Sequence, residues 1–212
     1  MFSVIFDMDG TLLDTQKICI DAWDYAGSLQ SFSNVGAHIP NVCGMNEVGW
    51  SNYLINEFKG LDIDAFKKEA YMYIEKNGKV EFKKGAVELI EFLKENNIKL
   101  AIASGSSAEI IKYNLSQVGA VDVFDEIVGG DEVEKGKPEP DIFLLAAKKL
   151  GVKPETCFVF EDSANGIKSG YAAGMKCIGI PDVAPFSKEA KELMLKELES
   201  LSEGIEILRE YL

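Results

Sequence analysis

Apolar residues along this chain gather in short unbroken runs, and longer amphipathic stretches separate these runs. Five runs are almost continuously apolar: Phe2–Phe6, Lys99–Ala103, Glu126–Val128, Cys157–Phe160 and Lys176–Ile180. A strand with one wet face alternates apolar and polar residues, whereas a continuous run suits a strand that is buried on both faces. The pattern therefore predicts five strands of a parallel sheet.

Between these runs, the apolar residues recur at helical spacing. Amphipathic stretches cover 85–97, 106–119, 139–151 and 163–174, and the tail at 187–211 predicts two helical pieces broken around Ser202–Gly204. In the first stretch, Val87, Ile90 and Leu93 share one face. The second begins with serine at a plausible N-cap and ends at Gly119, a residue suited to the position after a helix. Alternating strands and helices predict an α/β fold with a doubly wound, mainly parallel, Rossmann-like sheet.

One interval breaks this alternation. Between the first strand and the helix at 85 lie about seventy residues without a convincing strand, and three stretches there have helical spacing: 17–27, 45–58 and 62–78. The simplest interpretation is an inserted helical cap domain at 16–81, packed over one end of a core formed by 1–15 and 82–212. The chain would then leave and re-enter the core through hinges at Asp14–Thr15 and Phe82–Lys84.

Composition and charge narrow the possible partners and compartments. The 212 residues are 47% hydrophobic and 27% charged, and they carry a net charge of −13, without a run of lysine or arginine that nucleic acid would require. No stretch approaches the roughly 18 apolar residues that span a bilayer. The four cysteines form no CxxC pair and His38 is the only histidine, which disfavours a zinc site or a Ser-His-Asp triad. We expect a cytoplasmic protein, a monomer or weak dimer, that binds neither membranes nor nucleic acid.

Polar residues follow the predicted strands at the points where a parallel sheet binds ligands, beyond the carboxyl ends. They comprise four carboxylates, one hydroxyl and one lysine: Asp7, Asp9, Ser104, Lys137, Glu161 and Asp162. Carboxylates this close raise one another's pKa unless a cation neutralises them. Mg²⁺ prefers such oxygen ligands together with a substrate phosphate, and a nearby lysine suits that phosphate. The arrangement predicts Mg²⁺-assisted phosphoryl transfer.

These residues also stand in recognisable motifs. "DMDGTLLDT" resembles the DxDGTxxD motif of the haloacid dehalogenase-like (HAD) superfamily. Ser104 after a strand, Lys137 in "KGKPEPDIF" and "FEDSANGI" resemble the second, third and fourth motifs, in the same order. The helical insert resembles the C1-type cap of this superfamily, and the nearest subgroup is β-phosphoglucomutase-like and phosphoglycolate phosphatase-like.

The resemblance implies a role for each residue of the motifs. Asp7 would be the nucleophile that becomes an aspartyl-phosphate, and Asp9 would be the general acid and then the general base. Mg²⁺ would be held by Asp7, the Asp9 backbone carbonyl, Asp162 and, directly or through water, Glu161. Phosphoryl oxygens would be bound by a set that combines side chains with a glycine turn: Ser104, Lys137, Gly10 and Thr11.

The cap residues decide between related activities. Asp9 indicates a phosphate ester as substrate, which suits either a phosphatase or a phosphomutase. β-Phosphoglucomutases carry a cap histidine where this chain has Cys19, and a lysine and an arginine in the loop where it has Cys43 and Glu47. Glu47 would repel a second phosphate. We therefore expect hydrolysis of a small phosphomonoester, with a mutase or a catalytically weak binding member as alternatives. The cap residues expected to set substrate choice are Cys19, Cys43, Met45, Glu47 and Trp50.

Overall fold

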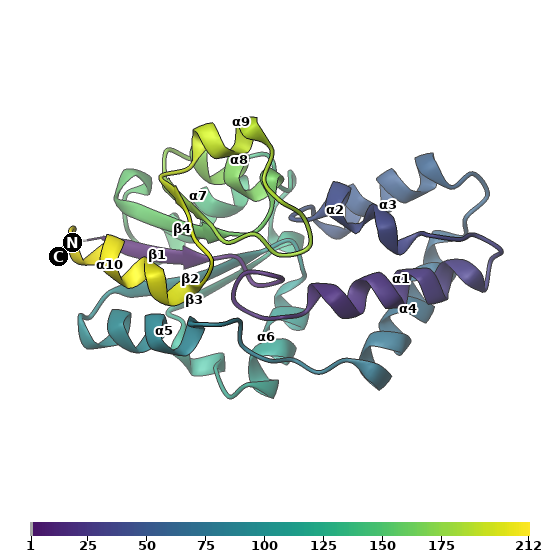
Figure 1. The fold of residues 1–212 in the computed structure, drawn as a ribbon, viewed down its shortest axis with the longest axis horizontal. Coiled ribbons are helices and arrows are strands. Elements are labelled where there is room, and N and C mark those ends of the chain that lie inside the picture. The colour runs from purple at the N-terminus through teal and green to yellow at the C-terminus, as the bar shows by residue number, and fades with distance from the viewer. Residues whose placement is uncertain (1) are drawn as a thin grey trace.

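A six-stranded sheet forms the centre of the computed structural model, which describes residues 2–212 (Figure 1). Its strands are β1 (Ser3–Phe6), β2 (Lys99–Ser104), β3 (Glu126–Gly129), β4 (Cys157–Glu161), β5 (Lys176–Gly179) and β6 (Lys196–Glu197). They lie in the order β3-β2-β1-β4-β5-β6, and every neighbouring pair is parallel. The five predicted strands are present, and the α/β class and the parallel sheet are confirmed.

The central position of β1 explains why its sequence is continuously apolar. Val4 pairs with Leu100 on one side and with Phe158 on the other, so the backbone of β1 is bonded along both edges. Val4, Ile5 and Phe6 are completely buried, because helices cover both faces of the sheet. A strand in this position places whatever follows it at the middle of the sheet edge.

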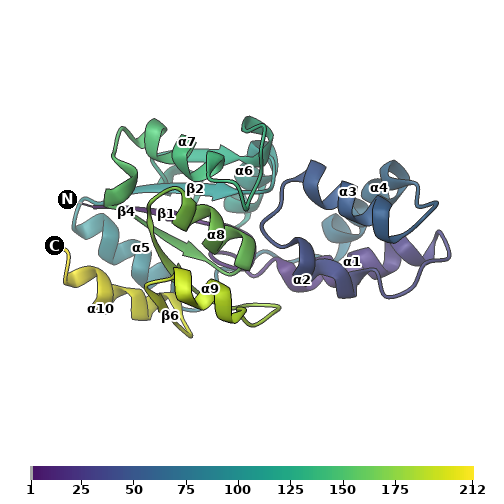
Figure 2. The same cartoon turned by 90° about the horizontal axis from the view of Figure 1, so that it is seen from above.

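The helices divide between the two faces of the sheet and a separate helical unit. Their bounds are α1 (Gln16–Ser28), α2 (Ile39–Val42), α3 (Glu47–Glu57), α4 (Ile63–Asn77), α5 (Ala86–Glu95), α6 (Ala108–Gln117), α7 (Asp141–Leu150), α8 (Ala164–Ala172), α9 (Lys188–Leu193) and α10 (Gly204–Arg209). Helices α5, α6 and α10 pack on one face, and α7, α8 and α9 on the other (Figures 1 and 2). The expected capping residues function as such: Ser107 accepts a hydrogen bond from the Ile110 amide, and Gly119 has a φ of +67°.

Two expectations about the helices were wrong in detail. Val87 is 44% exposed, and the buried stripe of α5 consists instead of Leu89, Ile90 and Leu93 together with Ala86. The tail breaks earlier than Ser202–Gly204, since α9 ends at Leu193 and the chain then adds β6 beside β5, while α10 begins at Gly204. A strand of two residues has no periodicity of its own, so only its pairing with β5 creates it.

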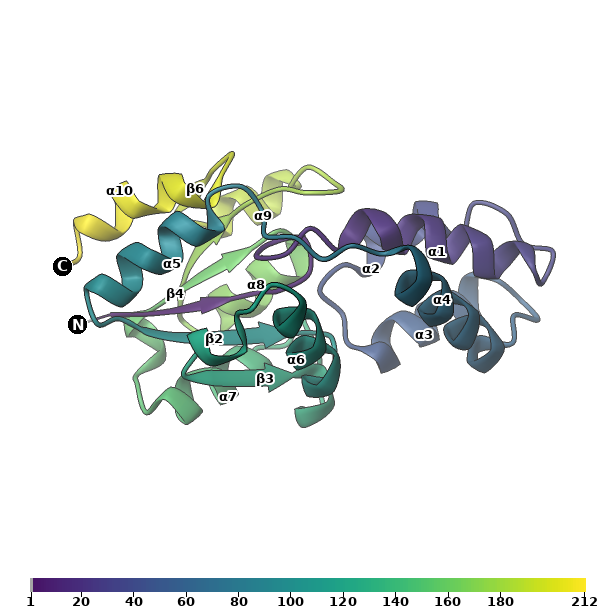
Figure 3. The same ribbon diagram turned by 90° about the horizontal axis from the view of Figure 1, so that it is seen from below.

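The helices of the insert lie beyond the carboxyl ends of the strands (Figures 1 and 3). Helix α1 packs along α4, and the two share an apolar cluster around Trp23, Leu54 and Phe66 that is distinct from the clusters on the sheet. This cluster gives the insert a hydrophobic centre of its own. We retain 16–81 as the proposed extent of the cap, with the core formed by 1–15 and 82–212.

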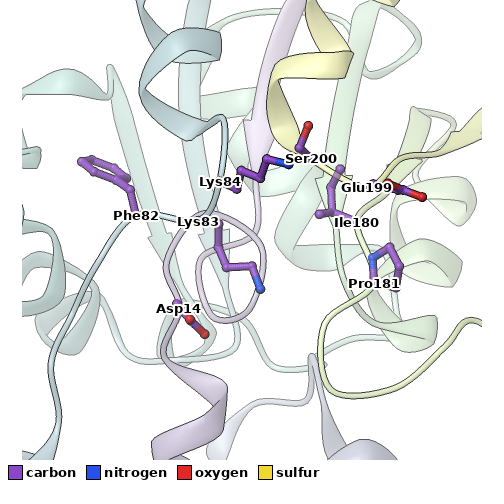
Figure 4. Close-up of a pocket in the computed structure, with 8 residues that line it drawn as sticks. All are labelled: Asp14, Phe82, Lys83, Lys84, Ile180, Pro181, Glu199 and Ser200. Atoms are coloured by element: carbon purple, nitrogen blue, oxygen red, sulfur yellow. The ribbon is translucent and has the colours of Figure 1, made fainter.

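The two linkers between core and cap run side by side. The Asp14 amide donates to the Glu81 carbonyl at 2.9 Å, and the Lys83 amide donates to the Leu12 carbonyl at the same distance. The Lys83 ammonium also forms an ion pair of 2.5 Å with Asp182, which follows β5. Lys83 lines a cavity of about 230 Å³ that the linkers share with segments of the core. Figure 4 shows the residues that line it. No helix among the described residues is sufficiently long and apolar to cross a bilayer.

Candidate active site

The turn after β1 presents its two aspartates to different surroundings. Asp7 is only 3% exposed and its amide continues the sheet, donating to the Phe160 carbonyl at 2.9 Å. Gly10 then turns the chain with a φ of +85°, and a Cβ there would lie 2.5 Å from a carboxylate oxygen of Asp162. Only glycine satisfies both conditions, so the turn can close tightly against the acid that follows β4.

Lys137 joins the aspartate of β1 to the glutamate of β4. Its ammonium donates to Asp7 Oδ1 at 2.5 Å, to Glu161 Oε1 at 2.6 Å and to the Ala103 carbonyl at 3.1 Å. The side chains of Lys137 and Glu161 are completely buried. A second oxygen of Glu161 accepts hydrogen bonds from the backbone amide and the hydroxyl of Ser163. The lysine therefore has a fixed position where three strands end.

Asp162 lies on the other side of this group and completes a cluster of acids. Asp7, Glu161 and Asp162 each offer one oxygen, and these three atoms lie within 4.8 Å of one another. The Thr11 hydroxyl donates to Asp162 Oδ1 at 3.1 Å, and the Gln16 amide donates to Asp162 Oδ2 at 2.8 Å. Three buried carboxylate oxygens at this spacing form a donor set that could hold a hard divalent cation such as Mg²⁺.

The electrostatics of the cluster show why a cation fits there. Burial raises the pKa of Asp7 from 3.8 to about 8, against the lowering effect of Lys137 and with further increases from Glu161 and Asp9. Burial, Glu161 and Asp7 likewise hold the pKa of Asp162 well above its usual range. Burial acts to lower the pKa of Lys137, but the two acids that it contacts keep that pKa above its usual value. Three acids thus share a single ammonium, and added positive charge would favour their ionised forms.

Asp9 faces away from the acid cluster and is held by three hydroxyls. Thr15 donates to its Oδ1 at 2.6 Å, and Ser106 and Ser104 donate to its Oδ2 at 2.8 and 3.2 Å. The residue is half-buried, whereas Asp7 is buried. This carboxylate therefore has a fixed orientation and is partly accessible, which suits a group that exchanges protons with a bound molecule.

The structure brings the residues of the four motifs together at one sheet edge. Asp7, Lys137 and Glu161 are in direct contact, and Ser104 contacts Asp9. Thr11 directs its hydroxyl to Asp162 rather than into open space, so its side chain supports the acid cluster. The backbone carbonyl of Asp9 accepts a hydrogen bond from Gln16 at 2.8 Å, and the same amide nitrogen contacts Asp162.

Three of the expected cap residues lie beside the core. Cys43 donates a hydrogen bond from its thiol to Gln16, and its carbonyl accepts one from Asn165 of α8 at 3.0 Å. The Met45 carbonyl lies so near Gly105 that a Cβ there would be 2.3 Å away. The Cys19 thiol donates to the Thr15 carbonyl at 3.3 Å, and burial together with the charge of Asp9 raises its pKa to about 12.

Glu47 and Trp50 have different surroundings, although both belong to α3. Glu47 forms an ion pair of 3.1 Å with Lys67 and accepts a hydrogen bond from the Tyr71 hydroxyl at 3.1 Å. Burial, Glu47, Cys19 and Asp9 together raise the pKa of Tyr71 above its usual range. Trp50 instead packs in the apolar centre of the cap, with its ring centroid 5.3 Å from that of Trp23.

Sequence reasoning did not identify four residues that complete this site. They are Thr15, Gln16, Tyr71 and Ser106. Ser106 stands in the same serine-rich run as Ser104, which could have drawn attention to it. The other three hold positions that depend on how the cap meets the core, and their immediate sequence carries no indication of that contact.

Comparison with known proteins agrees with the geometry. The family model for haloacid dehalogenase-like hydrolases matches residues 3–174. The chain is 34% identical over 194 residues to the bifunctional riboflavin kinase/FMN phosphatase of Arabidopsis thaliana, a match that covers 85% of this chain but about half (48%) of that longer protein. It is 32% identical over 181 residues to the phosphorylated carbohydrates phosphatase of Thermotoga maritima, with 84% of each chain covered.

A solved structure extends the match to the complete fold. The crystal structure of a hydrolase from Pseudomonas syringae superposes with a TM-score of 0.87 at 26% identity, with 99% of each chain covered. Both the motif residues after the strands and the family match lie within the same part of the chain, residues 3–174. This chain belongs to the haloacid dehalogenase-like hydrolase family.

Proposed function

We propose that the chain is a Mg²⁺-dependent phosphatase that hydrolyses a small phosphomonoester through an aspartyl-phosphate on Asp7. The observation that carries the proposal is the difference between its two aspartates. Asp7 is buried against Lys137 and the acid cluster, whereas Asp9 is half-buried and held by hydroxyls at the edge of the same space. This division suits a nucleophile and a proton carrier that act on the same phosphoryl group.

In the proposed mechanism, a carboxylate oxygen of Asp7 bonds to phosphorus as the bond between phosphorus and the alcohol oxygen breaks. Protonated Asp9 gives its proton to the departing oxygen. Asp9 then takes a proton from a water molecule that attacks phosphorus, which releases phosphate and restores both carboxyl groups. Lys137 and the Ser104 hydroxyl stabilise the negative charge on the phosphoryl oxygens. A cation held by Asp7, Asp162, Glu161 and the Asp9 carbonyl would neutralise charge during the transfer.

The cap supports a substrate that carries a single phosphate. Glu47 lies on α3 of the cap, where it shares its charge with Lys67 and accepts a hydrogen bond from Tyr71. A second phosphate on the substrate would meet this carboxylate and be repelled. We therefore propose a sugar phosphate or a similar small phosphorylated metabolite, as the name of the Thermotoga maritima relative also suggests. The chain would act as a cytoplasmic monomer or weak dimer.

The decisive experiment measures phosphate release from a general aryl phosphate, with and without Mg²⁺. Wild type should turn over only with the metal, and Asp7→Asn should lose activity by about 10⁴-fold or more, since no nucleophile remains. Asp122→Asn, which changes an exposed aspartate outside the four motifs, serves as the control and should match wild type. Equal activity in Asp7→Asn, or no activity in wild type across a broad phosphoester panel, would favour a binding or regulatory role.

A phosphomutase is the second candidate, because a nucleophile beside a proton carrier under a cap serves both reactions equally well. The mutase has to exclude water and pass the phosphoryl group to a second hydroxyl of the substrate. Incubation with β-glucose 1-phosphate and a trace of the 1,6-bisphosphate distinguishes the two. Glucose 6-phosphate without free phosphate would establish the mutase, and free phosphate alone would establish the phosphatase.

A further inference from the structure

Gln16 connects the cap to the acid cluster through a single buried amide. It is the first residue of α1 and is only 6% exposed. Its Nε2 donates to two oxygens of the core, the Asp9 carbonyl and Asp162 Oδ2, each at 2.8 Å. Its Oε1 accepts the thiol hydrogen of Cys43 at 2.9 Å. Every polar atom of this side chain therefore has a partner, with core acceptors on one side and the cap on the other.

The orientation of the amide follows from the chemistry of its neighbours. The Asp9 carbonyl and the Asp162 carboxylate are both acceptors, so a donor has to face them. The turn leaves room for this contact only because residue 10 is glycine, since a Cβ there would lie 2.7 Å from Gln16 Nε2 and 2.5 Å from Asp162 Oδ2. The glycine at position 10 therefore lets the backbone pass close to the contact between the Gln16 amide and the Asp162 carboxylate.

Both oxygens that Gln16 holds belong to groups that the proposed cation would use, the Asp9 carbonyl and the carboxylate of Asp162, which is part of the acid cluster. An N–H group carries partial positive charge and satisfies these oxygens when a cation does not. A dication bound to the same oxygens repels that N–H group and draws off the electron density that it accepts from, which weakens the hydrogen bonds of the amide and favours its turning away. We propose that the Gln16 amide competes with the divalent cation for the Asp9 carbonyl and Asp162, and that it transmits cation binding to the cap through Cys43. The inference rests on the metal site of the proposed function.

Transmission to the cap follows from what Cys43 contacts. Its thiol loses its acceptor when the Gln16 amide turns, while its carbonyl remains bonded to Asn165 of the core. The cap loop that contains Cys43 continues to Met45, whose carbonyl lies against Gly105 at the end of β2. A change at Gln16 therefore reaches the segment of the cap that lies directly on the catalytic edge of the sheet.

The test measures Mg²⁺ affinity by titration calorimetry on the full chain. Gln16→Leu and Gln16→Met both remove the donor and keep a side chain of similar size. Each should bind Mg²⁺ about tenfold more tightly than wild type, which corresponds to one charge-assisted hydrogen bond of ~1.4 kcal/mol that no longer competes. The control is Gln117→Leu on the exposed surface of α6, which should bind as wild type does.

Alkylation of Cys43, followed by peptide mass spectrometry, supplies a second readout. Mg²⁺ should change the alkylation rate of Cys43 in wild type and leave it unchanged in Gln16→Leu, with buried Cys157 and Cys177 as internal references. Unchanged or weaker Mg²⁺ affinity in both Gln16 variants would overturn the competition, because weaker binding would identify Gln16 as a ligand. A wild type that binds no Mg²⁺ would overturn the metal site itself, a different result from binding that Gln16 does not influence.

Discussion

The edge of the sheet and the facing surface of the cap hold their charges in opposite ways. At the sheet edge, the side chains of Lys137 and Glu161 are completely buried and that of Asp7 is 5% exposed. On the cap, the side chain of Glu47 is 50% exposed and that of its partner Lys67 is 24% exposed. Water screens the attraction between the two charges on the cap. The buried charges at the sheet edge are screened much less, so their electrostatic interactions are stronger.

This difference indicates which region fixes the chemistry and which is free to vary. A buried cluster with more acids than bases destabilises the fold unless a ligand compensates, as the raised pKa of Asp7 shows. Such a cluster is typical of a site that serves a reaction rather than stability. The ion pair on the cap contributes little to stability, so its residues could be exchanged for others while the fold persists. The two regions should therefore respond very differently to substitution.

The sharpest test of this contrast removes the shared cation of the sheet edge. Lys137→Met leaves Asp7 and Glu161 buried without their ammonium, and breaking a buried pair in this way costs about 3–5 kcal/mol. Activity should fall by about 10²-fold or more, because the group that we propose to stabilise the phosphoryl oxygens is lost. Urea unfolding in EDTA and phosphate release measure the two effects.

The matched control is Lys148→Met on the exposed side of α7, which should change both quantities little. If Lys137→Met is as stable as wild type in EDTA, then the lysine does not compensate the acid cluster. The conclusion that the buried charges affect stability far more than the exposed ones would then be wrong.

Acidity should affect the protein most when no divalent cation is present. The folded-state pKa of Asp7 is about 8 and its ordinary value is 3.8, so the folded chain holds this proton more tightly than the unfolded chain. Stability from this group is complete below pH 3.8 and is lost as the pH rises toward 8, and Asp162 acts in the same direction. In EDTA, we expect a loss of about 4 kcal/mol between pH 5 and 8, or roughly 8–16 °C in Tm.

Excess Mg²⁺ should remove most of this loss, because the cation favours the ionised carboxylates. Thermal melts at both pH values, with EDTA and with Mg²⁺, provide the comparison. Asp7→Asn should also flatten the dependence in EDTA. A wild type whose Tm rises from pH 5 to pH 8 without metal would contradict the raised pKa values.

Ser106 provides a smaller test, at the boundary between the two regions. Its hydroxyl donates to Asp9 at 2.8 Å, and Ser104 would leave Asp9 to bind phosphate. Ser106→Ala should lower kcat by about tenfold with little change in KM, because Asp9 loses one of the three hydroxyls that orient it. Ser106→Thr should restore much of the rate.

Ser116→Ala, in which an exposed hydroxyl on α6 is removed, is the control and should leave both constants unchanged. A rise in KM with kcat preserved would show that Ser106 binds substrate instead of positioning Asp9.

The sheet edge could be predicted from sequence to a larger extent than the cap surface. Continuous apolar runs such as Phe2–Phe6 suit parallel strands that are covered on both faces, and the residues that follow such strands gather at one edge of the sheet. This rule alone was enough to predict that Asp7 and Glu161 lie at the same edge of the sheet. The sequence did not predict strand β6, because that strand depends on pairing with β5. It did not predict the exposure of Val87 either, because that depends on which stripe of α5 meets the sheet.

The cap surface depends on contacts between segments that are distant in sequence. Glu47 was expected to influence the substrate, but its partners Lys67 and Tyr71 come from another helix. Gln16 contacts Asp162 across 146 positions of the chain. Helical periodicity identifies α3 and α4 but does not specify how they pack, and Trp50 accordingly lies in the apolar centre of the cap.

The smallest expected effect concerns substrate choice on the cap. Tyr71→Phe removes the hydroxyl that donates to Glu47, and Glu47→Gln removes the charge that opposes a second phosphate. Both variants should hydrolyse a simple aryl phosphate within about twofold of wild type, since neither touches the chemistry at the sheet edge. Glu47→Gln should raise kcat/KM for a sugar bisphosphate relative to the monophosphate by about threefold or more, because one screened repulsion disappears.

The exposed acid Glu57, at the far end of α3, supplies the matched control, and Glu57→Gln should leave the ratio of the two substrates unchanged. A fall in aryl phosphatase activity as large as that of Ser106→Ala would show that Glu47 participates in the reaction. The division between a buried edge that fixes the chemistry and an exposed surface that selects the substrate would then be wrong, since a solvent-screened pair on the cap would contribute as much to the transition state as a hydroxyl bonded to Asp9.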